Sequence, residues 1–213
     1  MREVLRGIVI GLVALALAGA IASRAGWGAI SVPRPAGTGA WLLARASGYA
    51  AFAALALDVI AGLLVSTRAG DRWIARGQLI ELHGWLSPLA LALVVGHVLA
   101  LLADRYLRFD VLDVLVPMVS PYRPIAVGLG IVAAYCAVVV HASFGFRRLL
   151  GTKAWRRLHY LSLVAFDAAA VHAFLAGTDA SRPWAIAICV VPLLGAAVLL
   201  AGRVRAAIAR RAG

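Results

Sequence analysis

Residues 78–102 read QLIELHGWLSPLALALVVGHVLALL, a stretch long and apolar enough to cross a bilayer, and they include His83 and His97. An ionisable ring at membrane depth is costly without a partner, so intramembrane histidines indicate a functional site. The two are 14 residues apart, which is about 21 Å along a helix and places one toward each face of a core about 30 Å thick. Fourteen steps of about 100° end within about 40° of whole turns, so both rings leave the same helix face.

A second apolar stretch, residues 158–175, carries His159 and His172, which are 13 residues apart. The two stretches would cross the membrane in the same direction, so equal depths pair His83 with His159 and His97 with His172. On a straight helix, 13 steps leave His172 about 140° around the axis from His159. A tilt of the helix, a bulge in it, or rings that approach their cofactors from different sides would reconcile this offset with the pairing. The pattern predicts two metal centres stacked across the membrane.

The composition places the chain among polytopic membrane proteins of the all-α class. Of its 213 residues, 63% are hydrophobic, and the mean hydropathy is +0.93, more than a soluble domain can bury. We therefore predict a six-transmembrane-helix bundle. Its apolar spans are expected at residues 4–21, 41–65, 79–102, 124–140, 158–175 and 184–200.

The organisation follows from these spans. Residues 1–40 are expected to form a first transmembrane helix and an outer loop, residues 41–203 the main transmembrane domain, and residues 204–213 a short basic tail. The first span, with Arg2 and Arg6 before its apolar run, also fits a signal peptide. We favour a retained helix because the run is long for a signal sequence.

The net charge of +12 is expected to reflect loops at the membrane surface. Because the basic residues fall in short inter-helix loops, contact with membrane lipid explains them and nucleic acid does not. Two thirds of the 21 Lys and Arg residues lie on the side that both termini share. The positive-inside rule therefore predicts a cell-membrane protein with both termini cytoplasmic, which puts His83 and His159 on the inner side. Cys136 and Cys189 lie in apolar spans without metal-binding spacing and are expected to be core residues.

Two neutral imidazoles at one depth on facing helices can hold a haem iron from both sides. Six-coordinate ligation leaves no open position, which suits electron transfer better than oxygen activation. The four histidines are therefore predicted to be axial ligands of haem b. Two haems are expected, or one if His159 is an interfacial residue.

With these histidines in place, the chain resembles the ferric reductase-like transmembrane domain family. The similar stretches are ARASGY at 44–49, GLLVSTR at 62–68, ELHGWLS at 81–87 and KAWRRLHYLSLVAF at 153–166. This family includes ferric reductases, the membrane half of NADPH oxidases and the haem-binding subunit of a periplasmic methionine sulfoxide reductase system. The resemblance implies a six-helix haem b domain that moves electrons from the cytoplasm to the exterior.

The larger family members also carry a flavin and nicotinamide domain after the last helix. No Gly-rich nucleotide fingerprint occurs in this sequence. The resemblance therefore implies the haem-binding membrane subunit of an oxidoreductase, with no flavin or nicotinamide site of its own. Its donor would be a separate cytoplasmic flavoprotein or a quinol, and its acceptor ferric iron, oxygen or a periplasmic partner protein.

Four further polar residues in the spans have two interpretations each. Arg45 lies at the depth of His97 and is expected either to bind a haem propionate or to reach the lipid headgroups. His141 is interpreted as an interfacial residue, with ligation in place of His159 as the alternative. Asp58 and Asp167 either hydrogen-bond histidine or backbone groups or pack as protonated acids.

Two other functions compete with the ferric reductase-like one. A quinol-linked cytochrome b subunit also places histidine pairs on two helices, but typically on the second and fourth, whereas here they are on the third and fifth. A small transporter or membrane scaffold would use the histidines as polar glue or proton relays and would bind no haem.

Overall fold

The computed structural model of the chain describes residues 39–71 and 73–212. Within them every regular element is helical. The helices are α2 (Gly39–Thr67), α3 (Arg76–Ala103), α4 (Val111–Leu115), α5 (Pro124–Gly145), α6 (Arg147–His159), α7 (Leu161–Ala176) and α8 (Pro183–Ala212). Five segments of this part of the chain are long and apolar enough to cross a membrane, namely α2, α3, α5, the continuous α6–α7 segment and α8. The predicted all-α class is confirmed for the described residues, and their five long apolar segments are consistent with a multi-pass membrane protein. The predicted span at 4–21 lies outside the described residues.

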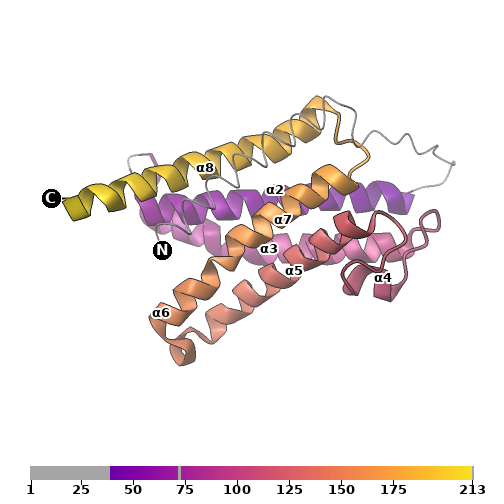
Figure 1. Cartoon of the computed structure of the whole chain (residues 1–213), viewed down its shortest axis with the longest axis horizontal. Helices are drawn as coiled ribbons and strands as arrows, with labels where there is room; N and C mark the ends of the chain where they lie inside the picture. The colour runs from indigo at the N-terminus through magenta and orange to yellow at the C-terminus, as the bar shows by residue number, and fades with distance from the viewer. Residues whose placement is uncertain (1–38, 72, 213) are drawn as a thin grey trace.

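Helix α2 lies at the centre of the arrangement (Figure 1). It packs against α3, α7 and α8, and α5 packs against α7. Its sequence is rich in alanine, and many of these alanines are buried, which lets neighbouring helices approach closely as is usual in membranes. The short helix α4 lies at one end of the long axis, and α6 lies near the opposite end (Figure 1).

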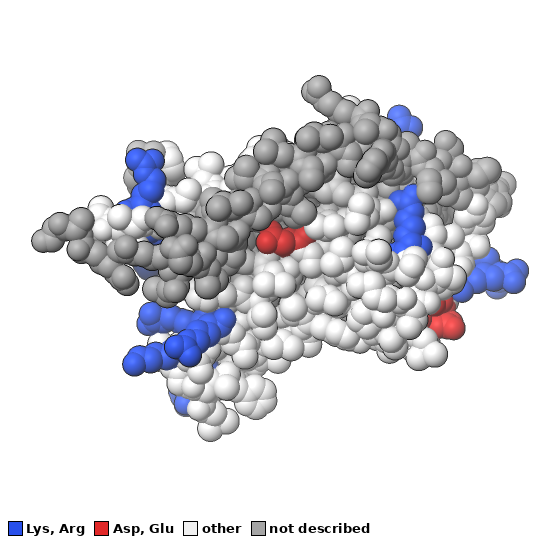
Figure 2. Space-filling view, in the orientation of Figure 1, with Lys and Arg blue, Asp and Glu red and all other residues white. Residues whose placement is uncertain are grey.

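The best-packed part of the core lies between α2, α7 and α8. There the rings of Phe52 and Phe166 stack with centroids 5.6 Å apart and planes inclined by 9°. By contrast, large apolar side chains such as Trp85, Leu149 and Val198 point outward, as expected of a surface that faces lipid. On the face seen in Figure 2, basic side chains gather toward the two ends and leave a largely uncharged band between them.

The basic stretch at 143–157, between the spans predicted at 124–140 and 158–175, was expected to be an inter-helix loop, and this prediction is wrong. Helix α5 continues to Gly145, and helix α6 begins two residues later at Arg147. The segment is rich in leucine, arginine and lysine, which favour helix, and its charged side chains remain exposed. Gly151, with φ 74° and ψ 157°, interrupts α6, and its positive φ is one that glycine adopts without strain.

A local change of helix geometry lies between His159 and His172. Helix α6 ends at His159 and α7 begins at Leu161, with Tyr160 between them. The Tyr160 amide bonds the Arg157 carbonyl, and the Leu163 amide bonds the Tyr160 carbonyl. Both are three-residue steps of the 3₁₀ type, in which each residue turns about 20° more than in an α-helix. The extra rotation moves His172 toward the face of His159 and accounts for part of the offset of about 140° expected from the 13-residue spacing.

Candidate functional site

The structure brings the four intramembrane histidines together in the two predicted pairs. The ring centroids of His83 and His159 are 6.1 Å apart with planes at 84°. Those of His97 and His172 are 6.3 Å apart with planes at 80°. We call them the inner pair and the outer pair, after the sides predicted from the charge distribution. Each pair joins α3 to the α6–α7 segment.

Both separations fit a single metal ion held between two imidazoles. A metal–imidazole nitrogen bond is about 2.0 Å, so two rings bound from opposite sides have centroids roughly 6.3 Å apart. Edge-to-face aromatic pairs also fall within about 4.5–7 Å, so the separation does not by itself identify a metal site. The hydrogen bonds of the rings add the second observation.

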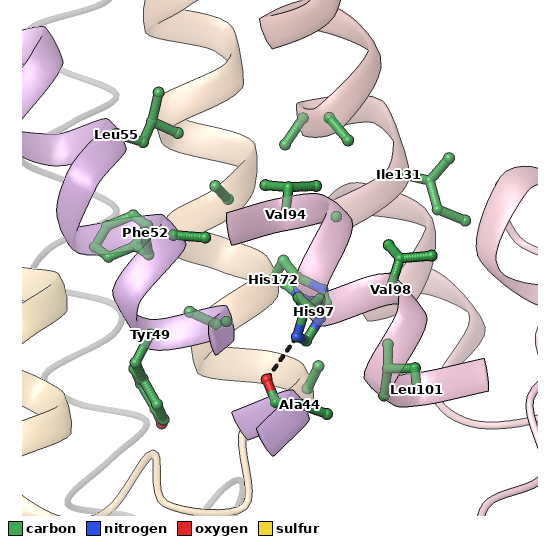
Figure 3. A pocket seen from close by; sticks show the side chains of 18 of the residues that line it. Ala44, Tyr49, Phe52, Leu55, Val94, His97, Val98, Leu101, Ile131 and His172 are labelled. Atoms are coloured by element: carbon green, nitrogen blue, oxygen red, sulfur yellow. Dashed lines mark hydrogen bonds between the residues drawn. The ribbon is translucent and has the colours of Figure 1, made fainter. Parts of the chain in front are cut away.

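Three of the four rings are oriented by a carbonyl oxygen of a neighbouring helix. Nδ1 of His97 lies 2.7 Å from the Ala44 carbonyl (Figure 3), and Nδ1 of His172 lies 2.8 Å from the Ala126 carbonyl. Nδ1 of His83 lies 3.1 Å from the carbonyl of Asp58. Because a carbonyl only accepts, Nδ1 carries the proton in each ring. Nε2 is then the unprotonated nitrogen that can bind a metal.

A glycine lies beside each of these three rings. A methyl group on Gly48 would come 2.9 Å from His97 Nδ1, and one on Gly130 would come 2.7 Å from His172 Nδ1. On Gly62 it would come 3.2 Å from His83 Cε1. Each glycine follows the accepting carbonyl by four residues. The missing side chain therefore gives the imidazole access to a carbonyl one turn earlier on the adjacent helix.

The inner pair has two additional contacts. His83 Nδ1 also lies 2.6 Å from Oδ1 of Asp58, so a carboxylate and a carbonyl of the same residue face one N–H group. The ring of His159 stacks on Trp155 of α6, with centroids 5.1 Å apart and planes at 28°. One inner histidine is thus held by a buried acid and the other by an aromatic ring.

A cavity of about 230 Å³ opens beside the outer pair. His97 and His172 line it, and nearly all of its remaining wall is apolar and comes from α2, α3, α5 and α7 (Figure 3). It extends as far as Asp58 and Ser87 but does not include His83 or His159 in its lining. The outer pair therefore adjoins a largely apolar, partly open cavity. About 31% of the His83 side chain is exposed.

Arg45 is a half-buried residue at the outer end of α2. Its guanidinium forms an ion pair with Asp179, in the turn between α7 and α8, and both side chains are largely covered. Arg45 also lines the cavity beside His97. The structure thus adds a protein partner that the sequence did not indicate, and contact with a propionate stays a prediction.

The other polar residues of the spans have different environments. His141 of α5 hydrogen-bonds Ser87 of α3, with Nδ1 and Oγ 3.0 Å apart, and belongs to neither pair. Asp167 has a covered Oδ1 without a hydrogen-bond partner among the described residues. Asp58, by contrast, contacts His83 as one of the two sequence interpretations proposed.

The glycines and carbonyls that orient the histidines were missed from sequence. A signal was nevertheless present, because Gly48 and Gly62 are 14 residues apart in α2. That interval equals the spacing of His97 and His83 in the antiparallel α3. Matched spacing of glycine in one span and histidine in the next would have indicated that each ring packs against a glycine.

Within the described residues, no three or more His, Cys, Asp or Glu side chains converge as they would around a zinc or calcium ion. Each pair therefore consists of two imidazole rings and includes no further side chain of these four types. Comparison of the chain with protein-family models, curated proteins and solved structures finds no significant match.

Proposed function

We propose that this chain carries electrons across a cell membrane through two b-type haems, as the haem-binding subunit of a ferric reductase-like oxidoreductase. His83 and His159 would bind the inner haem, and His97 and His172 the outer one. Bound haem supplies a reversible one-electron iron couple. For each electron transferred, a cytoplasmic flavoprotein or quinol loses one electron, and ferric iron, oxygen or a periplasmic partner gains one.

The observation that carries this proposal is the repeated geometry of the two pairs. Both have ring separations close to the roughly 6.3 Å expected of two imidazoles on one metal. His83, His97 and His172 present Nε2 as the free nitrogen because Nδ1 is engaged. A transporter or scaffold that used its histidines as polar glue would have no need to repeat this arrangement at two depths.

The surroundings of the pairs support the same proposal. The cavity beside the outer pair is lined mostly by apolar side chains, which suits the body of a porphyrin. Arg45 also lines this cavity, and its guanidinium would bind a propionate through its planar fork. At the other end, α6 presents exposed basic side chains near His159, a surface complementary to an acidic donor protein.

The test is an optical spectrum of the detergent-purified protein, oxidised and after dithionite, with a pyridine haemochrome assay for stoichiometry. We expect a low-spin b-type spectrum and two haems per chain. The single substitutions His83→Ala and His97→Ala should each remove one haem. Absence of haem after expression with ample haem supply would contradict the proposal.

His141→Ala serves as the matched control. This histidine also lies in a membrane-spanning helix, but it hydrogen-bonds Ser87 and lies outside both pairs. The variant should therefore keep two haems. Loss of a haem from His141→Ala together with full retention in a His159→Ala variant would assign the inner ligand to His141 instead.

A further inference from the structure

Three histidines are held by the same structural unit, which comprises a carbonyl, a glycine four residues later and the ring that packs against both. The units are Ala44, Gly48 and His97; Ala126, Gly130 and His172; and Asp58, Gly62 and His83. The residue that supplies the carbonyl is alanine in both outer units and aspartate in the inner one. The inner unit can therefore be compared directly with the two outer units, because it differs from them in having a carboxylate on the residue that supplies the carbonyl.

The Asp58 carboxylate is directed at the inner histidine. Its Oδ1 lies 2.6 Å from Nδ1 of His83, and the residue is buried, with about 8% of its surface exposed. A buried carboxylate in contact with an imidazole N–H interacts with it more strongly than a neutral carbonyl does. A carboxylate next to the N–H of a ligand imidazole makes that ligand more basic.

We propose that Asp58 sets the two haem sites at different reduction potentials, with the inner site lower. This inference rests on the proposed function. A more basic ligand and a nearby negative charge both stabilise ferric over ferrous iron. The outer histidines donate only to neutral carbonyls, and the nearby charge of Arg45 is offset by Asp179.

The consequence is a direction for electron flow. An electron entering at the inner pair moves to a site of higher potential at the outer pair, so transfer from the His83 end to the His97 end is favourable. Asp58 is thus a positioning and tuning residue that acts through His83. The difference in potential arises without any difference in the type of haem ligand.

The experiment is a spectroelectrochemical titration of the full-length, haem-loaded protein and of two variants. Asp58→Ala converts the inner unit to the composition of the outer units, and Asp58→Asn keeps the shape and an accepting oxygen but removes the charge. We expect two haems in each variant and a rise of the lower midpoint potential alone. A tenfold loss of preference for ferric iron corresponds to a rise of about 59 mV for a one-electron couple.

Two further proteins complete the design. The His97→Ala protein should retain only the inner haem. Titration of this protein at the lower potential would assign the lower midpoint to the inner haem. Asp167→Asn removes an intramembrane acid that forms no ion pair with a histidine among the described residues, unlike Asp58. It should leave both potentials unchanged.

The remaining outcomes are distinct. Unchanged potentials in both Asp58 variants with two haems bound would overturn this inference and leave the proposed function standing. Loss of the inner haem from Asp58→Asn as well as Asp58→Ala would assign Asp58 a purely structural role and also overturn it. A wild-type protein without haem would overturn both proposals.

Discussion

Gly130 of α5 lies against the ring of His172 of α7 so closely that a methyl group in its place would come 2.7 Å from Nδ1. The same relationship joins Gly48 to His97 at 2.9 Å. Real side chains do not approach at such distances, so either the ring or the helix would have to move. Each of the two glycines therefore fixes the position of one outer ring.

Gly130→Ala and Gly48→Ala are expected to disrupt the outer pair. The added methyl displaces the imidazole from its carbonyl, at a cost of about 1–3 kcal/mol for an overpacked site. The measurement is haem stoichiometry together with the thermal unfolding midpoint in detergent. We expect loss of one haem and a lower midpoint.

Gly96→Ala is the matched control for these variants. Gly96 is the immediate neighbour of His97, but an added methyl group there meets no atom within 4 Å. Alanine also favours helix over glycine by about 1 kcal/mol, so this variant should keep two haems and unfold no earlier than wild type. Equal haem loss in Gly96→Ala and Gly48→Ala would contradict the packing argument.

Gly62→Ala should have a milder effect, confined to the inner pair. An added methyl would come 3.2 Å from His83 Cε1, a distance that a shift of a few tenths of an ångström relieves. We expect a change in the inner haem spectrum or partial occupancy, with the outer haem unchanged. Equilibrium haem titration of the apoprotein measures this, and complete loss of both haems would show that the glycines stabilise the whole bundle.

Trp155→Ala is expected to weaken haem retention at the inner pair. The His159 ring stacks on Trp155, and an aromatic contact of this kind contributes about 1 kcal/mol, or roughly a fivefold change in affinity. Trp155→Phe should retain most of the haem affinity because it keeps a stacking ring. Trp85→Ala removes an exposed tryptophan from the α3 surface and should leave retention unchanged.

Arg45→Ala is expected to destabilise the outer end of the protein. It leaves Asp179 buried without its guanidinium partner, which costs about 3 kcal/mol for a covered ion pair. Thermal unfolding in detergent measures the loss. The double variant, with Asp179→Ala as well, should recover part of it, because no uncompensated charge remains.

The haem content of Arg45→Ala and of a single Asp179→Ala variant separates the two roles of Arg45. If the guanidinium also binds a propionate, Arg45→Ala loses outer haem more readily than Asp179→Ala does. Equal retention by both variants would limit Arg45 to the ion pair.

The positions of the five described membrane-spanning segments and the pairing of the four histidines could be predicted from sequence, although α8 continues to Ala212, beyond the predicted end at 200. The helix at 147–159 was not predicted, because its basic composition resembles a surface loop, whereas its leucines, lysine and arginines also favour helix. The partners of Asp58 and Arg45 could not be predicted either. Asp58 contacts a histidine 25 residues away, and Arg45 pairs with an acid in a distant turn.

The sequence by itself determined how far apart His83 and His97 lie along their helix, because the rise per residue is constant and 14 residues span about 21 Å. It also determined that these segments are apolar enough to cross a bilayer. Only the tertiary structure decided which atom each Nδ1 faces, because those carbonyls and glycines belong to other helices. The distinction between the inner and outer pairs likewise came from packing, since Asp58 acts on His83 only after α2 and α3 lie side by side.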